Sequence, residues 1–333
     1  MRFLVFLFFL MSLHLSASTL FNEEIDAFVN ELNEHPQLDQ REIREALQNI
    51  KISKKILTLM SKPAEKTKTW TQYRELLVSQ QRIAEGCRFI NVNKKTLLEA
   101  EKKYGVSSSI IAGIIGVETS YGKIKGNHNV FTALSTLAFR YPKNNSKRKK
   151  FFRYQLKEFL LMANSQRVNF NDYKGSYAGA LGIPQFMPDN YRRLAVDFNH
   201  DGKIDIIGNV EDAIGSIGNF LRFHGWIPDQ EVFFAIPKAH HVRASNIKYN
   251  LSATNTTLNE LIPDWQKIER LLKMEKGKFT PVSLLKLDEG GKKKQWLGFE
   301  NFFTLFHYNP RLFYALAVAS LARELNQCET ATQ

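Results

Sequence analysis

Residues 109–122 read Ser-Ile-Ile-Ala-Gly-Ile-Ile-Gly-Val-Glu-Thr-Ser-Tyr-Gly, an almost wholly apolar run that ends in one acidic side chain, Glu118. The length and apolar character of this run predict a buried helix over 107–119, capped by one of the serines at 107–109. Gly113 and Gly116 disfavour a helix energetically, so their presence suggests that another backbone approaches closely at these positions. We therefore expect a buried helix with Glu118 in its last turn.

Glu118 is not required by packing. A carboxylate near a helix C-terminus meets the negative end of the helix dipole, and burial beside isoleucines disfavours the ionised form, so both effects raise its pKa. A carboxylic acid that stays protonated near neutral pH is suited to protonating a poor leaving group. The alternative is a solvated Glu at the edge of a buried helix, with no chemical role.

Composition limits the classes of protein that this chain can represent. With 333 residues, 44% of them hydrophobic, the chain can bury a large core, and about two domains are expected. The net charge of +13 favours contact with polyanions such as nucleic acid, anionic lipid or an acidic cell-envelope polymer. No zinc-finger, RNA-binding or Walker signature accompanies the charge, so we expect no nucleic-acid partner.

The N-terminus predicts export. A short basic start and the apolar run at 3–11 precede the small residues Ser16-Ala17-Ser18, so residues 1–18 are interpreted as a signal peptide, with an uncleaved anchor as the alternative. No lipobox cysteine follows, and no later segment is long and apolar enough to span a bilayer. We expect a periplasmic or cell-envelope location. The sequence leaves open whether Cys87 and Cys328, its two cysteines, form a disulfide.

Periodicity along the chain predicts a mainly α fold of α+β type. Helical spacing covers 21–60 in short pieces, then 70–83, 93–104, 107–119, 148–164 and 310–325. Short strands are predicted at 231–236, 281–287 and 294–298, with a hairpin turn at 289–291 and a small helix at 257–275. We expect an N-terminal helical region at 19–66, a catalytic core at 67–226, a strand-containing insertion at 227–303 and a returning C-terminal helix at 304–333.

A second informative segment is the glycine-rich stretch at 175–188. It holds too many glycines for a regular element and too many apolar residues for an ordinary solvent loop. Ser176 and Gln185 offer hydrogen-bonding groups, while Tyr177 and Phe186 offer flat faces on which sugar rings stack. The alternative is a glycine-rich loop with a purely structural role.

The third segment, residues 197–205, matches the first nine positions of an EF-hand calcium loop. Oxygen ligands are predicted from Asp197, Asn199, Asp201 and the Lys203 carbonyl. Gly208 stands where the closing bidentate Glu is usual, so the last ligand must come later, from Asp212 or Glu211. We expect Ca²⁺ as a structural ion. The alternative is a metal-free turn between two helices.

These segments together carry a family resemblance. Residues 118–122, 177–182, 185–188, the Asp197 loop, and 212–214 with 224–226 occur in the order and with the residue types of the B-type lytic murein transglycosylases. The resemblance extends over 70–226 and 308–325. It implies a lysozyme-like helical core with an N-terminal helical region and a small β-containing insertion, and an enzyme that cleaves peptidoglycan without a catalytic cofactor. We expect a monomer whose partner is the glycan strand.

The resemblance also assigns roles to residues. Glu118 is implied to be the single acid and base, and the substrate-binding residues are implied to be Ser176, Gln185, Tyr308, Tyr314, Tyr73 and Lys143, beside Tyr177 and Phe186. The product is implied to carry a 1,6-anhydromuramoyl end. Phe220 and Asn144 depart from the family pattern. Two alternatives stay open at this point, a hydrolytic muramidase and a non-catalytic peptidoglycan-binding or assembly protein.

Overall fold

The computed structural model describes residues 21–61, 68–142, 145–238, 254, 256–262, 265–267, 280–289 and 291–330. The chain divides into two compact units. Unit 1 contains the chain up to Pro63, Gly126–Leu181 and Gln185–Arg193; unit 2 contains Ala64–Lys125, Gly182–Pro184 and Leu194–Gln333. This grouping differs from the ranges expected from the sequence, because 126–181 cluster with the N-terminal helices. The predicted signal peptide lies outside the described residues.

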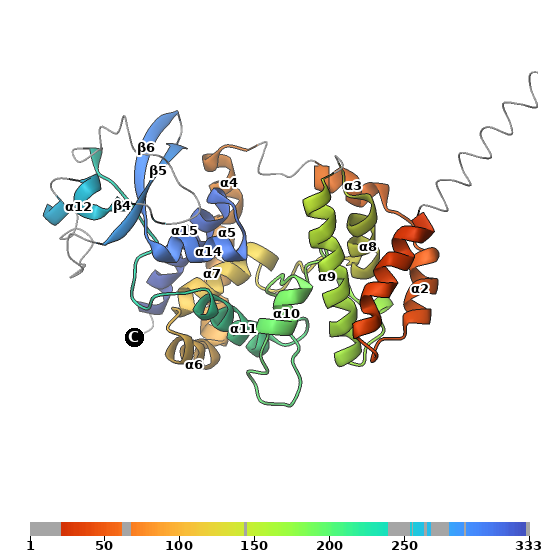
Figure 1. The fold of residues 1–333 in the computed structure, drawn as a ribbon. Helices are drawn as coiled ribbons and strands as arrows, with labels where there is room; N and C mark the ends of the chain where they lie inside the picture. The colour runs from red at the N-terminus through yellow and green to blue at the C-terminus, as the bar shows by residue number, and fades with distance from the viewer. Residues whose placement is uncertain are drawn as a thin grey trace, which may run out of the picture. The chain divides into compact units, whose positions relative to one another are not determined.

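Unit 1 is a helical unit (Figure 1). Its elements are η1 (Leu32–Glu34), α2 (Gln40–Gln48), α3 (Lys54–Ser61), α8 (Val130–Arg140), α9 (Ser146–Ser165), η4 (Phe170–Asp172) and α10 (Pro188–Leu194), with the short pair β1 (His128–Asn129) and β2 (Lys174–Gly175). Helices α8 and α9 pack against each other, and each buries large aromatic side chains, such as Phe139 and Phe159. The start of α9 follows from Asn145, whose side chain accepts from the Arg148 amide.

Unit 2 is built around a buried helix, α7 (Ser108–Thr119), as the sequence predicts. It packs against α5 (Gln80–Val92), α6 (Lys94–Tyr104), α11 (Val210–Phe223) and α15 (Leu312–Thr330). A Cβ atom added at Gly113 would lie 3.1 Å from the Val318 carbonyl oxygen of α15. The prediction that glycine allows close backbone approach is therefore confirmed at this position.

Helix boundaries differ from expectation where capping residues intervene. The single helix predicted over 70–83 is two helices, α4 (Trp70–Leu77) and α5, because the Ser79 side chain accepts from the Arg82 amide and begins a new helix. Ser107 occupies the N-cap position of α7, as predicted, but its side chain does not cap the helix. Ser107 makes no side-chain cap hydrogen bond, and the Glu101 carboxylate accepts from the Ser108 amide instead, at 2.9 Å. Helices α8 and α11 were not predicted.

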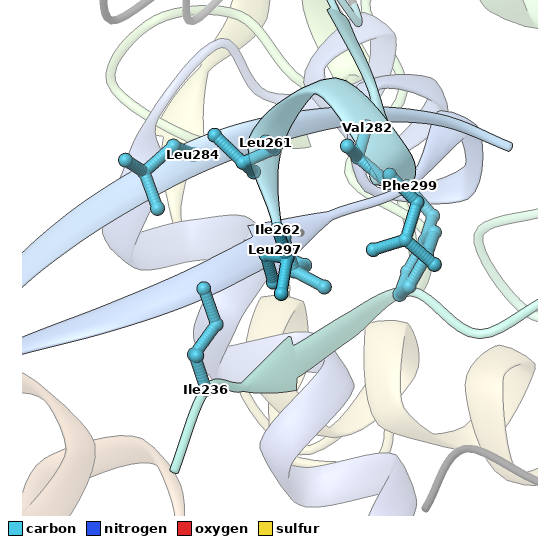
Figure 2. Close-up of a cluster of buried hydrophobic side chains, with 8 residues drawn as sticks. Ile236, Leu261, Ile262, Val282, Leu284, Leu297 and Phe299 are labelled. Atoms are coloured by element: carbon cyan, nitrogen blue, oxygen red, sulfur yellow. The ribbon is translucent and has the colours of Figure 1, made fainter. Parts of the chain in front are cut away.

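The strand-containing region forms one antiparallel sheet in unit 2, with strand order β3-β6-β5-β4. Its strands are β3 (Phe233–Ala235), β4 (Thr256–Thr257), β5 (Pro281–Glu289) and β6 (Lys292–Gly298), and β5 pairs with β6 through the predicted hairpin. Figure 2 shows the apolar cluster on one face, where Leu284 and Leu297 meet Phe299 and the residues of α12 (Leu258–Leu261). Helix α12 is shorter than the predicted 257–275, part of which is not described. Within the described part of the chain, no helix has the length and apolarity needed to cross a membrane.

Candidate active site

Glu118 lies one residue before the end of α7 and is half-buried. The helix ends because Ser120 and Tyr121 both adopt left-handed backbone conformations, with φ of 49° and 60°. The Ser120 amide donates to the Gly116 carbonyl and the Tyr121 amide to the Ile115 carbonyl, so the last turn keeps its hydrogen bonds. The chain therefore turns sharply away just after the carboxylate.

Two tyrosines from the C-terminal part of the chain face Glu118. Tyr308 ends α14 (Glu300–Tyr308), and Tyr314 lies in the first turn of α15. Burial raises the pKa of both hydroxyl groups well above the ordinary value, and the Glu118 carboxylate raises it further. Both hydroxyls therefore remain protonated at neutral pH. Apart from its interaction with the Glu118 carboxylate, the Tyr314 hydroxyl has no hydrogen-bond partner among the described residues.

Aromatic contacts fix these tyrosines. The Tyr308 ring packs on Phe220 with ring centroids 4.8 Å apart, and its hydroxyl donates to the Pro184 carbonyl at 2.5 Å. Tyr73 on α4 is buried, packs against Phe313 at 5.7 Å, and adds to the charge environment of Tyr314. Phe220, where the family pattern suggests tyrosine, therefore supports Tyr308 through packing. The structure brings Glu118, Tyr73, Tyr308 and Tyr314 together within unit 2.

Most of the glycine-rich segment clusters with unit 1, whereas Gly182–Pro184 cluster with unit 2. The ends of the segment are tied where Leu181 and Phe186 exchange two backbone hydrogen bonds. The Ser176 hydroxyl accepts from the Ala178 and Ala180 amides, which makes this serine the anchor of a tight turn. A Cβ atom at Gly179 would lie 2.3 Å from Leu134, so the segment is pressed against the helical core. The expectation of a shaped, partly buried segment is confirmed.

Not every predicted side chain in this segment is accessible. Phe186 is only 2% exposed, so the prediction that its ring offers a face to a sugar is wrong; it packs into the core as an anchor of the segment. Tyr177 is half-buried and meets the edge of His128, with ring centroids 6.5 Å apart. Gln185 adopts a left-handed backbone conformation with φ of 52°. Lys143 lies outside the described residues.

The predicted calcium loop forms a network of side-chain to backbone hydrogen bonds. Asp197 accepts from the amides of Asp201 and Gly202, and the Asn199 amide group donates to Asp201 at 3.0 Å. Hydrogen bonds from Asn199 and the Lys203 amide lower the pKa of Asp201. Side chains that are suited to a hard cation therefore gather at the start of the loop.

Asp212 closes this loop from α11. It is fully buried, and its two carboxylate oxygens accept from the amides of Phe198 and Asp205, at 2.8 and 2.7 Å. Glu211, the other candidate for the last ligand, accepts from the Thr96 hydroxyl. Among the described residues, no three acidic, histidine or cysteine side chains converge as a metal-binding group. A calcium ion here would therefore need the amide and main-chain oxygens as well.

A cavity of about 500 Å³ lies at the other end of α7. Its walls include Ser107, Ser109, Trp226 and Arg323, and none of the residues predicted to bind substrate lines it. Glu101, also in its wall, is hydrogen-bonded to Ser108. The cavity is therefore separate from the Glu118 site, which lies about nine residues further along the helix, roughly 13 Å at the rise of an α-helix.

The sequence did not single out Arg82, and it left the pairing of the two cysteines open. Arg82, on α5, donates to the Gly116 carbonyl of α7, and Cys87 forms a disulfide with Cys328 of α15. No local pattern marks either contact, because the partners are separated by 34 and 241 residues. The disulfide resolves the question that the sequence left open.

Comparison with known proteins identifies the family. The family model described as "Transglycosylase SLT domain" matches residues 20–323. The chain is 32% identical over 311 residues to the membrane-bound lytic murein transglycosylase B of Escherichia coli, covering 91% of this chain and 82% of that protein.

Solved structures give the same result. The soluble lytic transglycosylase SltB1 of Pseudomonas aeruginosa superposes with a TM-score of 0.79 at 34% identity, covering 92% of this chain and 99% of that one. The Escherichia coli lytic transglycosylase Slt35, in complex with bulgecin A, has a TM-score of 0.77 at 30% identity, covering 92% and 94%. The predicted mainly α, lysozyme-like fold is thus confirmed. The chain belongs to the transglycosylase SLT domain family and, within it, to the B-type lytic murein transglycosylases.

Proposed function

We propose that this enzyme cleaves the β-1,4 bond between N-acetylmuramic acid and N-acetylglucosamine in peptidoglycan, with Glu118 as its single acid and base. The observation that carries the proposal is the position of a half-buried carboxylate at the end of α7, facing the hydroxyls of Tyr308 and Tyr314. Glu101, a nearby acid in the sequence, is engaged at the opposite end of the same helix.

In this reaction Glu118 first gives its proton to the oxygen of the glycosidic bond, which breaks. The resulting carboxylate then takes the proton of the muramoyl C6 hydroxyl, whose oxygen bonds to C1 and closes the 1,6-anhydro ring. Glu118 ends as it began and no water is consumed, so a second catalytic carboxylate is not required, unlike in hydrolytic glycosidases. Tyr314, held protonated by burial, stabilises the carboxylate between the two steps, while the stacked Tyr308 ring supports Tyr314.

Further residues complete the proposal. Ser176, Gln185, Tyr177 and Tyr73 are the proposed glycan contacts, and Lys143 meets a carboxylate of the lactyl or peptide group. The protein acts as a monomer, exported by the signal peptide at 1–18 to the periplasm or cell envelope. A P. aeruginosa relative, SltB3, is known in complex with a NAG-anhNAM-pentapeptide, which supports a peptidoglycan ligand for this chain.

Calcium belongs to the same proposal as a structural ion, not a participant in the chemistry. Asp197, Asn199, Asp201, the Lys203 carbonyl and Asp212 would hold it. The Asp212 oxygens already accept backbone amides, but a carboxylate has about four acceptor positions, so a cation can share them. The Escherichia coli Slt35 structure in complex with calcium supports this assignment.

The test is product analysis on purified sacculi. Wild-type protein should release anhydromuropeptides, and Glu118→Gln should release none while keeping its circular dichroism and unfolding temperature. Glu99→Gln, an exposed acid on α6, is the matched control and should remain active. Products heavier by one water would identify a muramidase instead. Binding to sacculi without soluble release by the wild type would identify a non-catalytic binder.

A further inference from the structure

Arg82 contacts the chain on both sides of Glu118. Its guanidinium Nη1 donates to the carbonyl oxygen of Gly116, and its own carbonyl oxygen accepts from the Tyr121 hydroxyl at 3.0 Å. Gly116 precedes Glu118 by two residues and Tyr121 follows it by three. One residue in the first turn of α5 therefore holds the helix end before the carboxylate and the turn after it.

The turn that Arg82 holds is strained. Ser120 and Tyr121 are consecutive non-glycine residues with positive φ. Such conformations cost about 1–3 kcal/mol each and persist only where surrounding contacts enforce them. The Thr119 hydroxyl contributes by donating to the Ile183 carbonyl at 3.0 Å and accepting from the Gly122 amide. The turn that follows Glu118 is thus held by contacts made outside α7.

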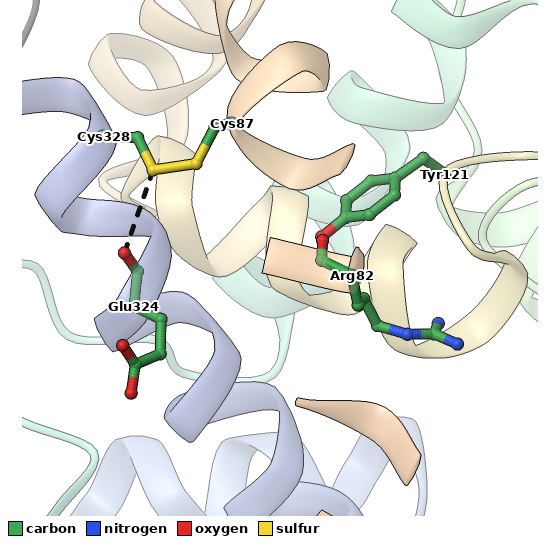
Figure 3. Close-up of a disulfide and its surroundings, with 5 residues drawn as sticks. All are labelled: Arg82, Cys87, Tyr121, Glu324 and Cys328. Atoms are coloured by element: carbon green, nitrogen blue, oxygen red, sulfur yellow. Dashed lines mark hydrogen bonds between the residues drawn. A yellow bond between two sulfur atoms is a disulfide. The ribbon is translucent and has the colours of Figure 1, made fainter. Parts of the chain in front are cut away.

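Tyr121 reaches Arg82 through a slot made by two glycines. A Cβ atom at Gly86 of α5 would lie 2.3 Å from the Tyr121 hydroxyl oxygen, and one at Gly116 of α7 would lie 2.7 Å from it. Any other residue at either position would push the phenol ring away. Burial raises the pKa of Tyr121, so its hydroxyl stays protonated and donates to the main-chain carbonyl of Arg82. Figure 3 shows the phenol ring beside Arg82.

Helix α5 is itself fixed to the helix that carries Tyr314. Cys87 follows Gly86 in α5, and its disulfide with Cys328 joins α5 to α15 (Figure 3). Tyr314, whose hydroxyl faces Glu118, lies in the first turn of α15. Helix α5 is therefore linked both to α7, which carries Glu118, and to α15, which carries Tyr314.

We propose that Arg82 is a positioning residue for Glu118: by binding Gly116 and Tyr121 it fixes the strained turn that aims the carboxylate. Arg82 acts through Glu118 without touching substrate, so the inference rests on the proposed function. A guanidinium suits this role because it stays charged and bonds a carbonyl at a helix C-terminus, where positive charge is favoured.

The first experiment compares kcat and KM on soluble glycan strands for Arg82→Met, Arg82→Lys and the control Arg88→Met. Arg88 is an exposed arginine on the same helix. A misplaced catalytic group lowers turnover more than binding, so Arg82→Met should lower kcat about 10- to 100-fold with KM changed less than about twofold. Arg82→Lys keeps a charged donor and should recover part of kcat. Arg88→Met should match the wild type.

The second experiment keeps the inference testable if Arg82→Met does not fold. Tyr121→Phe removes the hydrogen bond to Arg82 but leaves the ring in its slot, and should lower kcat about 3- to 10-fold, since the lost bond is worth about 1 kcal/mol. In a double-mutant cycle with Arg82→Lys, the two losses should be less than additive, because both act on the same turn.

Several outcomes would overturn the inference. They are an unchanged kcat in Arg82→Met or Tyr121→Phe, a loss shared by Arg88→Met, a loss that only tracks the unfolded fraction, or strictly additive effects in the cycle. Wild-type protein that yields no anhydro products would overturn the proposed function, and the role of Arg82 with it. Full wild-type activity with an unaffected Arg82→Met would overturn this inference alone.

Discussion

Tyr308 and Tyr314 stack on each other, with ring centroids 6.2 Å apart and ring planes inclined by 16°. They come from the end of one helix and the start of the next, with the link at 309–311 between them. The Glu118 carboxylate, which lies about 190 residues earlier in the chain, raises the pKa of both hydroxyls. The stack therefore supports the Tyr314 ring, whose hydroxyl is directed at the carboxylate.

Replacing Tyr314 tests this partnership. Tyr314→Phe removes a donor directed at the Glu118 carboxylate, so the charged form loses stabilisation. We expect the limb of the kcat/KM profile that reports Glu118 to move to higher pH, with kcat lowered about 10-fold, as for loss of a hydrogen bond to a charged group. Tyr154→Phe, at an exposed tyrosine, is the control. Identical pH profiles for wild type and Tyr314→Phe would contradict the assignment.

The same tyrosines predict a loss of stability at alkaline pH. Their folded-state pKa values are raised, first by burial and then by Glu118, so their contribution to stability is complete below the unfolded value near 10 and is lost as pH rises toward the folded value. The unfolding temperature of the wild type should therefore fall more steeply between about pH 10 and 11.5 than that of Tyr308→Phe/Tyr314→Phe. If the unfolding temperatures of the two proteins fell equally with pH, the claim that burial raises the pKa of these hydroxyls would be contradicted.

Alanine at two glycines of α7 separates the effect of close packing from helix propensity. A Cβ at Gly116 would lie 2.7 Å from the Tyr121 hydroxyl and 2.9 Å from Leu321, whereas at Gly113 the nearest atom is 3.1 Å away. Gly116→Ala should destabilise the protein by about 1–3 kcal/mol through overpacking. Gly113→Ala should cost less, because alanine gains up to about 1 kcal/mol in helix propensity. Urea unfolding measures both, and equal effects would contradict the slot around Tyr121.

The disulfide should contribute strongly to stability because it encloses a long stretch of chain. Cys87 and Cys328 are 241 residues apart, so their link restricts the unfolded chain strongly. Replacing both by serine should lower the free energy of unfolding by about 2–5 kcal/mol. Denaturant curves with and without reductant provide the measurement. Reductant should shift the wild-type curve and leave that of the double variant unchanged; a shift in both would point to another cause.

Terbium luminescence tests the calcium loop. Purified protein should show a saturable site whose signal calcium displaces. Asp197→Asn/Asp201→Asn removes two charged ligands and should weaken binding by more than 10-fold, since affinity in such loops follows ligand charge. Asp172→Asn, on an exposed turn of unit 1, is the control. A wild-type protein without a saturable site would remove calcium from the description of this enzyme.

The local sequence was sufficient to predict elements that depend on residues close together in the chain. The apolar run at 109–117 determined the buried helix α7, because only burial accommodates so many adjacent isoleucines. The strands β5 and β6 and their hairpin followed from alternation and glycine. The oxygen-rich loop at 197–205 likewise follows from spacing. Prediction failed where a capping side chain replaces a helical hydrogen bond. The Ser79 side chain accepts from a backbone amide and so divides one expected helix into two.

The sequence by itself determined that Glu118 ends a buried helix and, through its motifs, the family and the chemistry. Tertiary structure brought Tyr308 and Tyr314, which the family resemblance had implied as site residues, close to Glu118, and it alone revealed the contact of Arg82 from α5. It also paired the cysteines and buried Phe186, which the sequence had presented as an open ring. The physical reason is range. Helix periodicity and capping act over a few residues and can be recognised in the local sequence. Burial and side-chain contacts join segments that are far apart in the chain, and neither segment alone carries a pattern that identifies its partner.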